Sequence, residues 1–77
     1  MISRDKYLYP IKLDTVHDVI EFCKIAAKCP YEVTLVNGKH RLNAKSFLGV
    51  SIAKVSWEEV YVETEEDCYF EFEKFII

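Results

Sequence analysis

The side chains best suited to covalent or metal chemistry in this sequence are two histidines and three cysteines. An imidazole nitrogen can accept a phosphoryl group, and a thiolate can act as a nucleophile or a metal ligand. His17 and His40 stand alone, and two isolated histidines do not make a metal site. The spacing of Cys23, Cys29 and Cys68 matches no metal or thioredoxin-like motif. We therefore expect buried free thiols, no metal, no cofactor and no enzyme.

Carboxylates and hydroxyls form the other polar candidates. The acidic run Glu63–Asp67 could recruit a basic partner or a cation, and it could equally supply negative charge at the start of a helix, which is the favoured interpretation. Thr15 and Ser46 each precede a stretch with helical periodicity, where a hydroxyl oxygen can cap the first turn. Backbone N–H groups at such a helix start can also hold an anion.

Composition sets the class of protein that must position these groups. The 77 residues are expected to form one domain over residues 1–77, with 51% hydrophobic residues to build a core. A net charge of -3 argues against nucleic acid as the main partner. No apolar run reaches the ~20 residues that cross a bilayer, and the N-terminus has no secretion-signal pattern. An odd number of cysteines fits a reducing compartment, so a cytoplasmic protein with no membrane partner is expected.

The first third of the chain predicts a strand followed by a helix. Apolar and polar residues alternate over residues 7–13, and Pro10 lacks an N–H, which favours a strand at the edge of a sheet. Thr15 and Asp18 have the spacing of a capping box. The helix that they open is expected to end before Pro30, because the residue before a proline disfavours the α conformation.

The middle of the chain predicts a hairpin and a short helix. Asn37 and Gly38 lie between two alternating segments and are expected to be the two turn residues, because both tolerate positive φ. Ser46 is expected to cap a helix over residues 47–53 and to lie near the backbone N–H of Leu48 or Gly49. Gly49 is expected to weaken this helix by about 1 kcal/mol relative to alanine.

The last third predicts a strand over residues 59–63 and a final short helix whose first turn begins at Thr64. The element order is βαββαβα, and the two main helices must cover one face of one sheet, because neither can bury its apolar stripe alone. The side chains expected between the helices and the sheet are Tyr7, Ile11, Val19, Ile20, Cys23, Val33, Leu35, Val60, Val62, Phe72 and Ile76.

Residues 33–50 read VTLVNGKHRLNAKSFLGV and resemble HPr, the histidine phosphocarrier family of the bacterial sugar phosphotransferase system. The segments NGK at 37–39 and, above all, LNAKSFLGV at 42–50 carry the resemblance. The NAKS version is especially similar to the catabolite-repression HPr homologue, a regulatory relative. The resemblance implies an α+β, HPr-like open-faced β-sandwich, with a four-stranded antiparallel sheet and helices on one face.

At the position where HPr carries its phosphoryl-accepting histidine, within G-[IL]-H-A-R-P, this chain has Thr15. His17 takes the arginine position and Asp18 the proline position. Thr15 has no imidazole nucleophile, and Asp14 and Asp18 would repel an incoming phosphoryl group. We therefore expect no ordinary phosphocarrier activity, and His17 is expected to be an exposed helix residue rather than a displaced acceptor.

Ser46 aligns with the serine that HPr kinase/phosphorylase phosphorylates in the regulatory members. A phosphate there would add about 1.5 to 2 negative charges beside Lys45 at the positive end of a helix. Phe47 and Leu48, where the family has Ile and Met, are expected to be half-exposed and to form a docking patch. The resemblance implies protein partners such as HPr kinase/phosphorylase or a transcriptional regulator.

The leading interpretation is thus a non-catalytic HPr-like protein that is regulatory through Ser46. One alternative is a degenerate HPr-fold interaction module without phosphorylation, in which Ser46 is only an N-cap. A weaker alternative is an active phosphocarrier of the sugar phosphotransferase system that uses His17.

Overall fold

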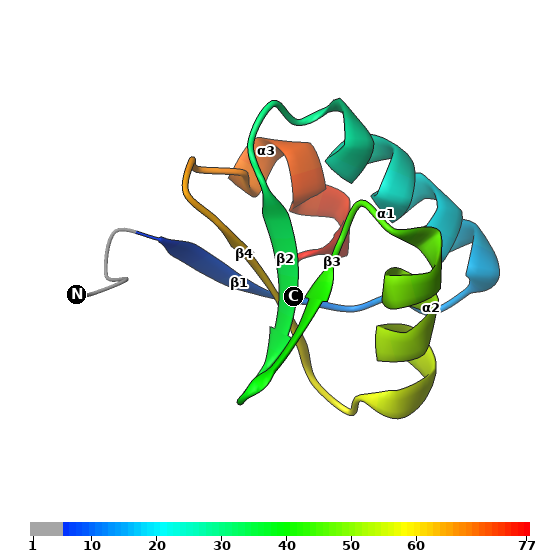
Figure 1. Cartoon of the computed structure of the whole chain (residues 1–77). Helices are drawn as coiled ribbons and strands as arrows, with labels where there is room; N and C mark the ends of the chain where they lie inside the picture. Colours follow the sequence, from blue (N-terminus) through cyan, green and yellow to red (C-terminus); the bar gives the residue numbers. More distant parts are fainter. Residues whose placement is uncertain (1–5) are drawn as a thin grey trace.

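The computed structural model describes residues 6–77, which fold into a four-stranded antiparallel sheet with three helices (Figure 1). The elements are β1 (Tyr7–Ile11), α1 (Val16–Lys28), β2 (Val33–Asn37), β3 (His40–Asn43), α2 (Phe47–Ser56), β4 (Val60–Thr64), α3 (Tyr69–Phe72) and a 3₁₀ turn at Glu73–Phe75. The strands lie in the order β1-β4-β2-β3, so the last strand in sequence pairs with the first two. The predicted α+β class and element order are confirmed.

Strand β1 forms one edge of the sheet, as Pro10 predicted. Pro10 pairs with Tyr61 of β4, and among residues 6–77 no further strand pairs with the other side of β1. The C-terminal residues close part of this edge. Ile76 forms a bridge with Ile11, and the Ile77 N–H donates to the Pro10 carbonyl at 3.0 Å. The C-terminal residues therefore lie against the second half of β1.

The core lies between the sheet and the helices. Its buried residues include, as predicted, Ile11, Val19, Val33, Leu35, Val60, Val62 and Phe72. Phe22 completes an aromatic centre, because its ring centroid lies 4.6 Å from that of Phe72 and 5.5 Å from that of Phe75. Figure 1 shows the helices on one side of the sheet, which is where this centre lies. Burying one such side chain contributes roughly 1.5–3 kcal/mol.

Four residues of the predicted core are not fully buried, and two of these predictions are wrong outright. Tyr7 is 41% exposed and Ile20 is 38% exposed, while Cys23 and Ile76 are half-buried. Burial rises along β1 from Tyr7 to the buried Ile11, so the helices cover only the end of this edge strand. Helix α1 buries Val19, Phe22 and Ala26 instead, which turns Ile20 away from the sheet.

The hairpin lies at the predicted place, with its turn shifted by one residue. Asn37 is the last residue of β2 and pairs with His40, so the two turn residues are Gly38 and Lys39. Gly38 has a φ of 59°, and no other residue in the described chain has positive φ. Because only the first turn residue needs positive φ, one glycine is sufficient and Asn37 stays in the sheet.

The prediction of a helix start at Thr64 is wrong. Thr64 is buried and ends β4, where it pairs with both Tyr7 and Val33, so the strand ladder holds it in the sheet. Its hydroxyl donates to the Glu66 carbonyl at 2.5 Å. Helix α3 begins only at Tyr69 and has no side-chain cap. The acidic run therefore forms a turn between β4 and α3.

None of the helices described in residues 6–77 has the length and apolar character that crossing a membrane requires.

Candidate functional site at two helix N-termini

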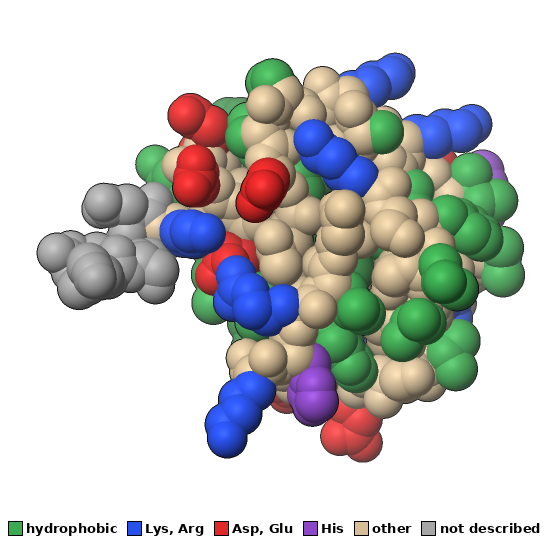
Figure 2. Space-filling view, in the orientation of Figure 1, with side chains coloured by type: hydrophobic (Ala, Val, Ile, Leu, Met, Phe, Trp, Pro, Cys, Tyr) green, Lys and Arg blue, Asp and Glu red, His purple; other side chains and the backbone are tan. Residues whose placement is uncertain are grey.

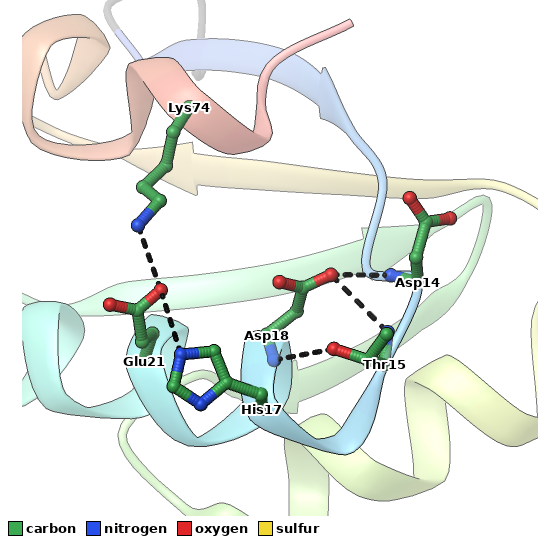
Figure 3. A network of polar contacts seen from close by, with 6 residues as sticks. All are labelled: Asp14, Thr15, His17, Asp18, Glu21 and Lys74. Carbon is green, nitrogen blue, oxygen red and sulfur yellow. Dashed lines mark hydrogen bonds and ion pairs between the residues drawn. The ribbon is translucent and has the colours of Figure 1, made fainter.

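The N-terminus of α1 is capped by the side chains of Thr15 and Asp18, as Figure 3 shows. The Thr15 hydroxyl accepts the Asp18 N–H at 3.1 Å, and the Asp18 carboxylate accepts the N–H groups of Thr15 at 3.2 Å and Asp14 at 2.9 Å. The predicted capping box is therefore confirmed with aspartate in place of the usual glutamate.

This arrangement decides what the start of α1 can bind. The Asp18 carboxylate accepts two N–H groups that lie just before the first helical residue, and its negative charge complements the positive end of the helix. Asp14 lies beside it and is also exposed. A phosphoryl group approaching Thr15 would meet the negative charge of two carboxylates.

His17 points along α1 toward Glu21 rather than toward the helix start (Figure 3). Its side chain is 76% exposed, and its Nε2 atom lies 3.7 Å from Glu21 Oε1. The same carboxylate oxygen accepts a hydrogen bond from Lys74 Nζ at 2.7 Å, which lowers the pKa of Glu21 below its ordinary value. His17 is thus an exposed helix residue, held beside an ion pair that ties α1 to the 3₁₀ turn.

The N-terminus of α2 has a different construction. The Ser46 hydroxyl accepts the Gly49 N–H at 3.2 Å, so the predicted N-cap is confirmed and Gly49, rather than Leu48, is its donor. The Ser46 N–H donates to the Asn43 carbonyl at 3.1 Å. The first turn of α2 contains no acidic residue, and the helix continues to Ser56, three residues beyond the predicted end.

Gly49 brings the start of α2 close to β3. A Cβ atom at this position would lie 3.0 Å from the Asn43 carbonyl oxygen, which belongs to the backbone and cannot easily move. Gly49 is buried in the first turn of α2, and only a short loop separates this helix from β3. The sequence reasoning treated this glycine only as a weak point of the helix. The signal for its real role was a glycine inside a helical segment, which often has a packing reason.

Lys45, predicted to stand beside a phosphate on Ser46, makes a contact with another element. Its ammonium group donates to the Cys29 carbonyl at 2.9 Å, at the residue that ends α1. A cation at this end of a helix is favourable because the unsatisfied carbonyls there carry partial negative charge. The backbone N–H of Lys45 donates to the Asn43 side chain at 2.9 Å. Lys45 thus fixes the loop before Ser46 against α1.

Phe47 and Leu48 are exposed, as predicted, at 53% and 68%. Val16 is 66% exposed on the adjacent helix α1, and Ile20 lies one turn further along. We call these four residues the α1–α2 apolar surface, and Figure 2 shows hydrophobic side chains gathered over the two helices. Ile20 was not expected on this surface, because its helical spacing predicted that it would face the sheet.

The remaining candidates form no reactive centre. Cys23, Cys29 and Cys68 are free, and burial raises the pKa of Cys23 and Cys68, so these thiols stay protonated near neutral pH. The His40 ring lies 6.2 Å from that of Trp57, at the end of α2. Within residues 6–77, no three His, Cys, Asp or Glu side chains are grouped so that they could hold a metal ion.

Comparisons of the chain with protein-family models, with curated proteins and with solved structures found no match.

Proposed function

We propose that this chain is a non-catalytic HPr-like protein that works as a regulatory phosphoacceptor, with Ser46 as the phosphorylated residue and Phe47 and Leu48 as the contact for a protein partner. The observation that carries the proposal is the start of α2. A hydroxyl caps a helix without acidic residues in its first turn, directly before two exposed apolar side chains.

The architecture supports the HPr-like part of the proposal. The βαββαβα order and the antiparallel sheet with helices on one face agree with the open-faced sandwich that residues 33–50 imply. Shared architecture alone is a weak argument for function. The proposal therefore depends mainly on Ser46 and its surroundings.

The chemistry at Ser46 would be a phosphoryl transfer in which the seryl oxygen bonds to the γ-phosphorus of ATP and ADP leaves. The kinase would supply the metal ion and the general base, so this chain needs to contribute only the hydroxyl. The phosphate oxygens would then face the first-turn N–H groups, where Ser46 Oγ now accepts the Gly49 N–H. The helix would stay capped while the surface beside Phe47 gains negative charge.

A phosphocarrier role using a residue of α1 is the less favourable candidate. Thr15 and Asp18 already accept each other's backbone N–H groups, and His17 lies against Glu21 instead of near the helix start. We expect that Enzyme I with phosphoenolpyruvate transfers no phosphate to this protein. An acid-labile phosphate on His17 would contradict this expectation.

An interaction module that is not phosphorylated is the second candidate, and one observation favours it. The α1–α2 apolar surface extends onto α1 through Val16 and Ile20, beyond the helix that Ser46 caps. Such a surface can bind a partner by apolar contact alone. The two candidates differ in whether a charge at Ser46 changes that binding.

The deciding experiment is incubation with purified HPr kinase/phosphorylase and ATP, followed by intact-mass measurement and peptide mapping. We expect one phosphate on the wild type and none on Ser46→Ala. Ser51→Ala, a change on the same helix, serves as the matched control and should be modified like the wild type. No modification, or a phosphate mapped to another residue, would reject the regulatory role and leave the interaction module.

A further inference from the structure

The charge of this chain is divided sharply along the sequence. Residues 1–57 contain nine Lys or Arg and five Asp or Glu, whereas residues 58–77 contain one lysine and eight acidic residues. The single lysine, Lys74, is hydrogen-bonded to Glu21 on α1. The end of β4, the following turn and α3 therefore produce a negative field that the segment itself does not neutralise.

The acidic turn surrounds an ordered set of aromatic rings. The centroids of Tyr9 and Tyr69 lie 5.7 Å apart at 64°, and those of Tyr69 and Phe70 lie 5.5 Å apart at 86°, both edge-to-face. Phe70 is 82% exposed, and Tyr69 is 36% exposed. Single exposed apolar residues are common, but three rings in contact at the surface are typical of an interface.

Asp67 holds these rings in place. One of its carboxylate oxygens accepts the Tyr9 hydroxyl at 2.8 Å and the Tyr69 backbone N–H at 3.0 Å. The hydrogen bond to this carboxylate raises the pKa of Tyr9 to about 12, so the hydroxyl keeps its proton. The Tyr9 ring and the backbone of Tyr69 are thus held in place before any partner arrives, which reduces the entropy that binding must overcome.

The neighbouring carboxylates define the chemistry of that partner. Glu65 and Glu66 are exposed in the turn before Asp67, and Figure 2 shows acidic side chains gathered over the β4–α3 turn. Glu63 is different, because it is half-buried and pairs with Lys6 and Arg41. We call Tyr9, Tyr69 and Phe70, with Glu65, Glu66 and Asp67, the aromatic–acidic surface.

We propose that the aromatic–acidic surface binds an arginine-rich segment of a partner protein, with a guanidinium group over the Phe70 ring and further cations paired with Glu65 and Glu66. A cation over an aromatic face is attracted by the ring, and arginine adds planar stacking that lysine lacks. Nucleic acids and anionic membranes carry the same sign of charge as this surface and are repelled. This surface is separate from Ser46 and does not depend on the function proposed above.

The test is a titration of the ¹⁵N-labelled protein with a short oligo-arginine peptide, compared with oligo-lysine and oligo-glutamate peptides of the same length. We expect saturable amide shifts in residues 65–71, tighter binding of arginine than of lysine, no binding of glutamate, and weaker binding at higher salt. Phe70→Ala should weaken oligo-arginine binding about fivefold, which corresponds to about 1 kcal/mol.

The matched control is Val55→Ala, because Val55 is also 82% exposed but lies on α2. It should bind oligo-arginine like the wild type. If the wild type and Phe70→Ala bind oligo-arginine with equal affinity, the binding is non-specific charge attraction, and the proposal is overturned. Shifts confined to other residues would also overturn it. So would a concentration-dependent dimer that Phe70→Ala abolishes, since the basic part of a second copy would then be the occupant.

Discussion

The starts of α1 and α2 share one capping design and differ in the side chain at the third helical residue. In both helices an N-cap hydroxyl accepts the N–H of the third helical residue, at 3.1 Å for Thr15 and at 3.2 Å for Ser46. That third residue is Asp18 in α1 and Gly49 in α2. Asp18 returns a carboxylate to the N-cap backbone, whereas Gly49 returns nothing and lets the Asn43 backbone approach.

The same capping motif leaves the two helix starts with different charge. At α1 the negative charge that a helix start attracts is already supplied by the chain, so the motif contributes only stability. At α2 the N-cap N–H is bound by the Asn43 carbonyl, and no acidic side chain lies in the first turn. An added phosphate at Ser46 would therefore meet partial positive charge, whereas one at Thr15 would meet two carboxylates.

The largest expected effect concerns Gly49. Gly49→Ala should lower the free energy of unfolding by about 1–3 kcal/mol, because the new Cβ would lie against the Asn43 carbonyl and overpack the contact. Helix propensity alone predicts the opposite sign, a gain of about 1 kcal/mol. Chemical denaturation measures the change, with Ser56→Ala at the exposed end of α2 as the control. If Gly49→Ala is more stable than the wild type, the close approach of the Asn43 carbonyl does not require glycine at this position.

Alanine at the two N-caps tests what the helix starts share. Thr15→Ala and Ser46→Ala should each cost about 0.5–2 kcal/mol, because each leaves the N–H of the third helical residue without its partner. Urea denaturation of the two variants and the wild type measures this. A cost at only one of the two sites would contradict the shared design.

Aspartate at the same positions tests how they differ. Ser46→Asp should keep most of the cap and gain from the helix dipole by about 0.3–1 kcal/mol at low salt. Thr15→Asp should be less stable than the wild type, because a third carboxylate would join Asp14 and Asp18. Thermal melts at low and high salt measure both changes, and salt should reduce the difference between them. Equal changes in stability for the two variants would contradict the proposed difference in charge between the two helix starts.

The smallest effect concerns the pH dependence of the ion pair beside α1. The hydrogen bond from Lys74 lowers the pKa of Glu21 below 4.5, so its contribution to stability is present above that pH and is lost as the pH falls through the lowered value. Lys74→Met should return the pKa of Glu21 toward 4.5, as measured by NMR titration of the carboxyl carbon. Lys24→Met, an exposed change on the same helix, should leave that pKa unaltered.

The local features of this protein could be read from its sequence. Thr15 with Asp18, Ser46 before α2, the position of the hairpin and the edge strand marked by Pro10 were all predicted correctly. The caps and the hairpin turn depend on hydrogen bonds and steric limits among residues a few positions apart, and the edge strand was indicated by the missing N–H of Pro10. Such signals lie in residue types and short spacings, so the sequence is enough to predict them.

Which faces of the helices and strands are buried, and which distant side chains contact each other, could be seen only in the tertiary structure. Ile20 and Phe22 are both apolar and lie on one helix, and the aromatic centre with Phe72 and Phe75 selected Phe22 for the core. Thr64 stayed in the sheet because two strands pair with it. Lys45 reached the end of α1 sixteen residues before it, at Cys29. These contacts join segments distant in sequence, and their energies depend on how the whole chain packs, which local patterns do not encode.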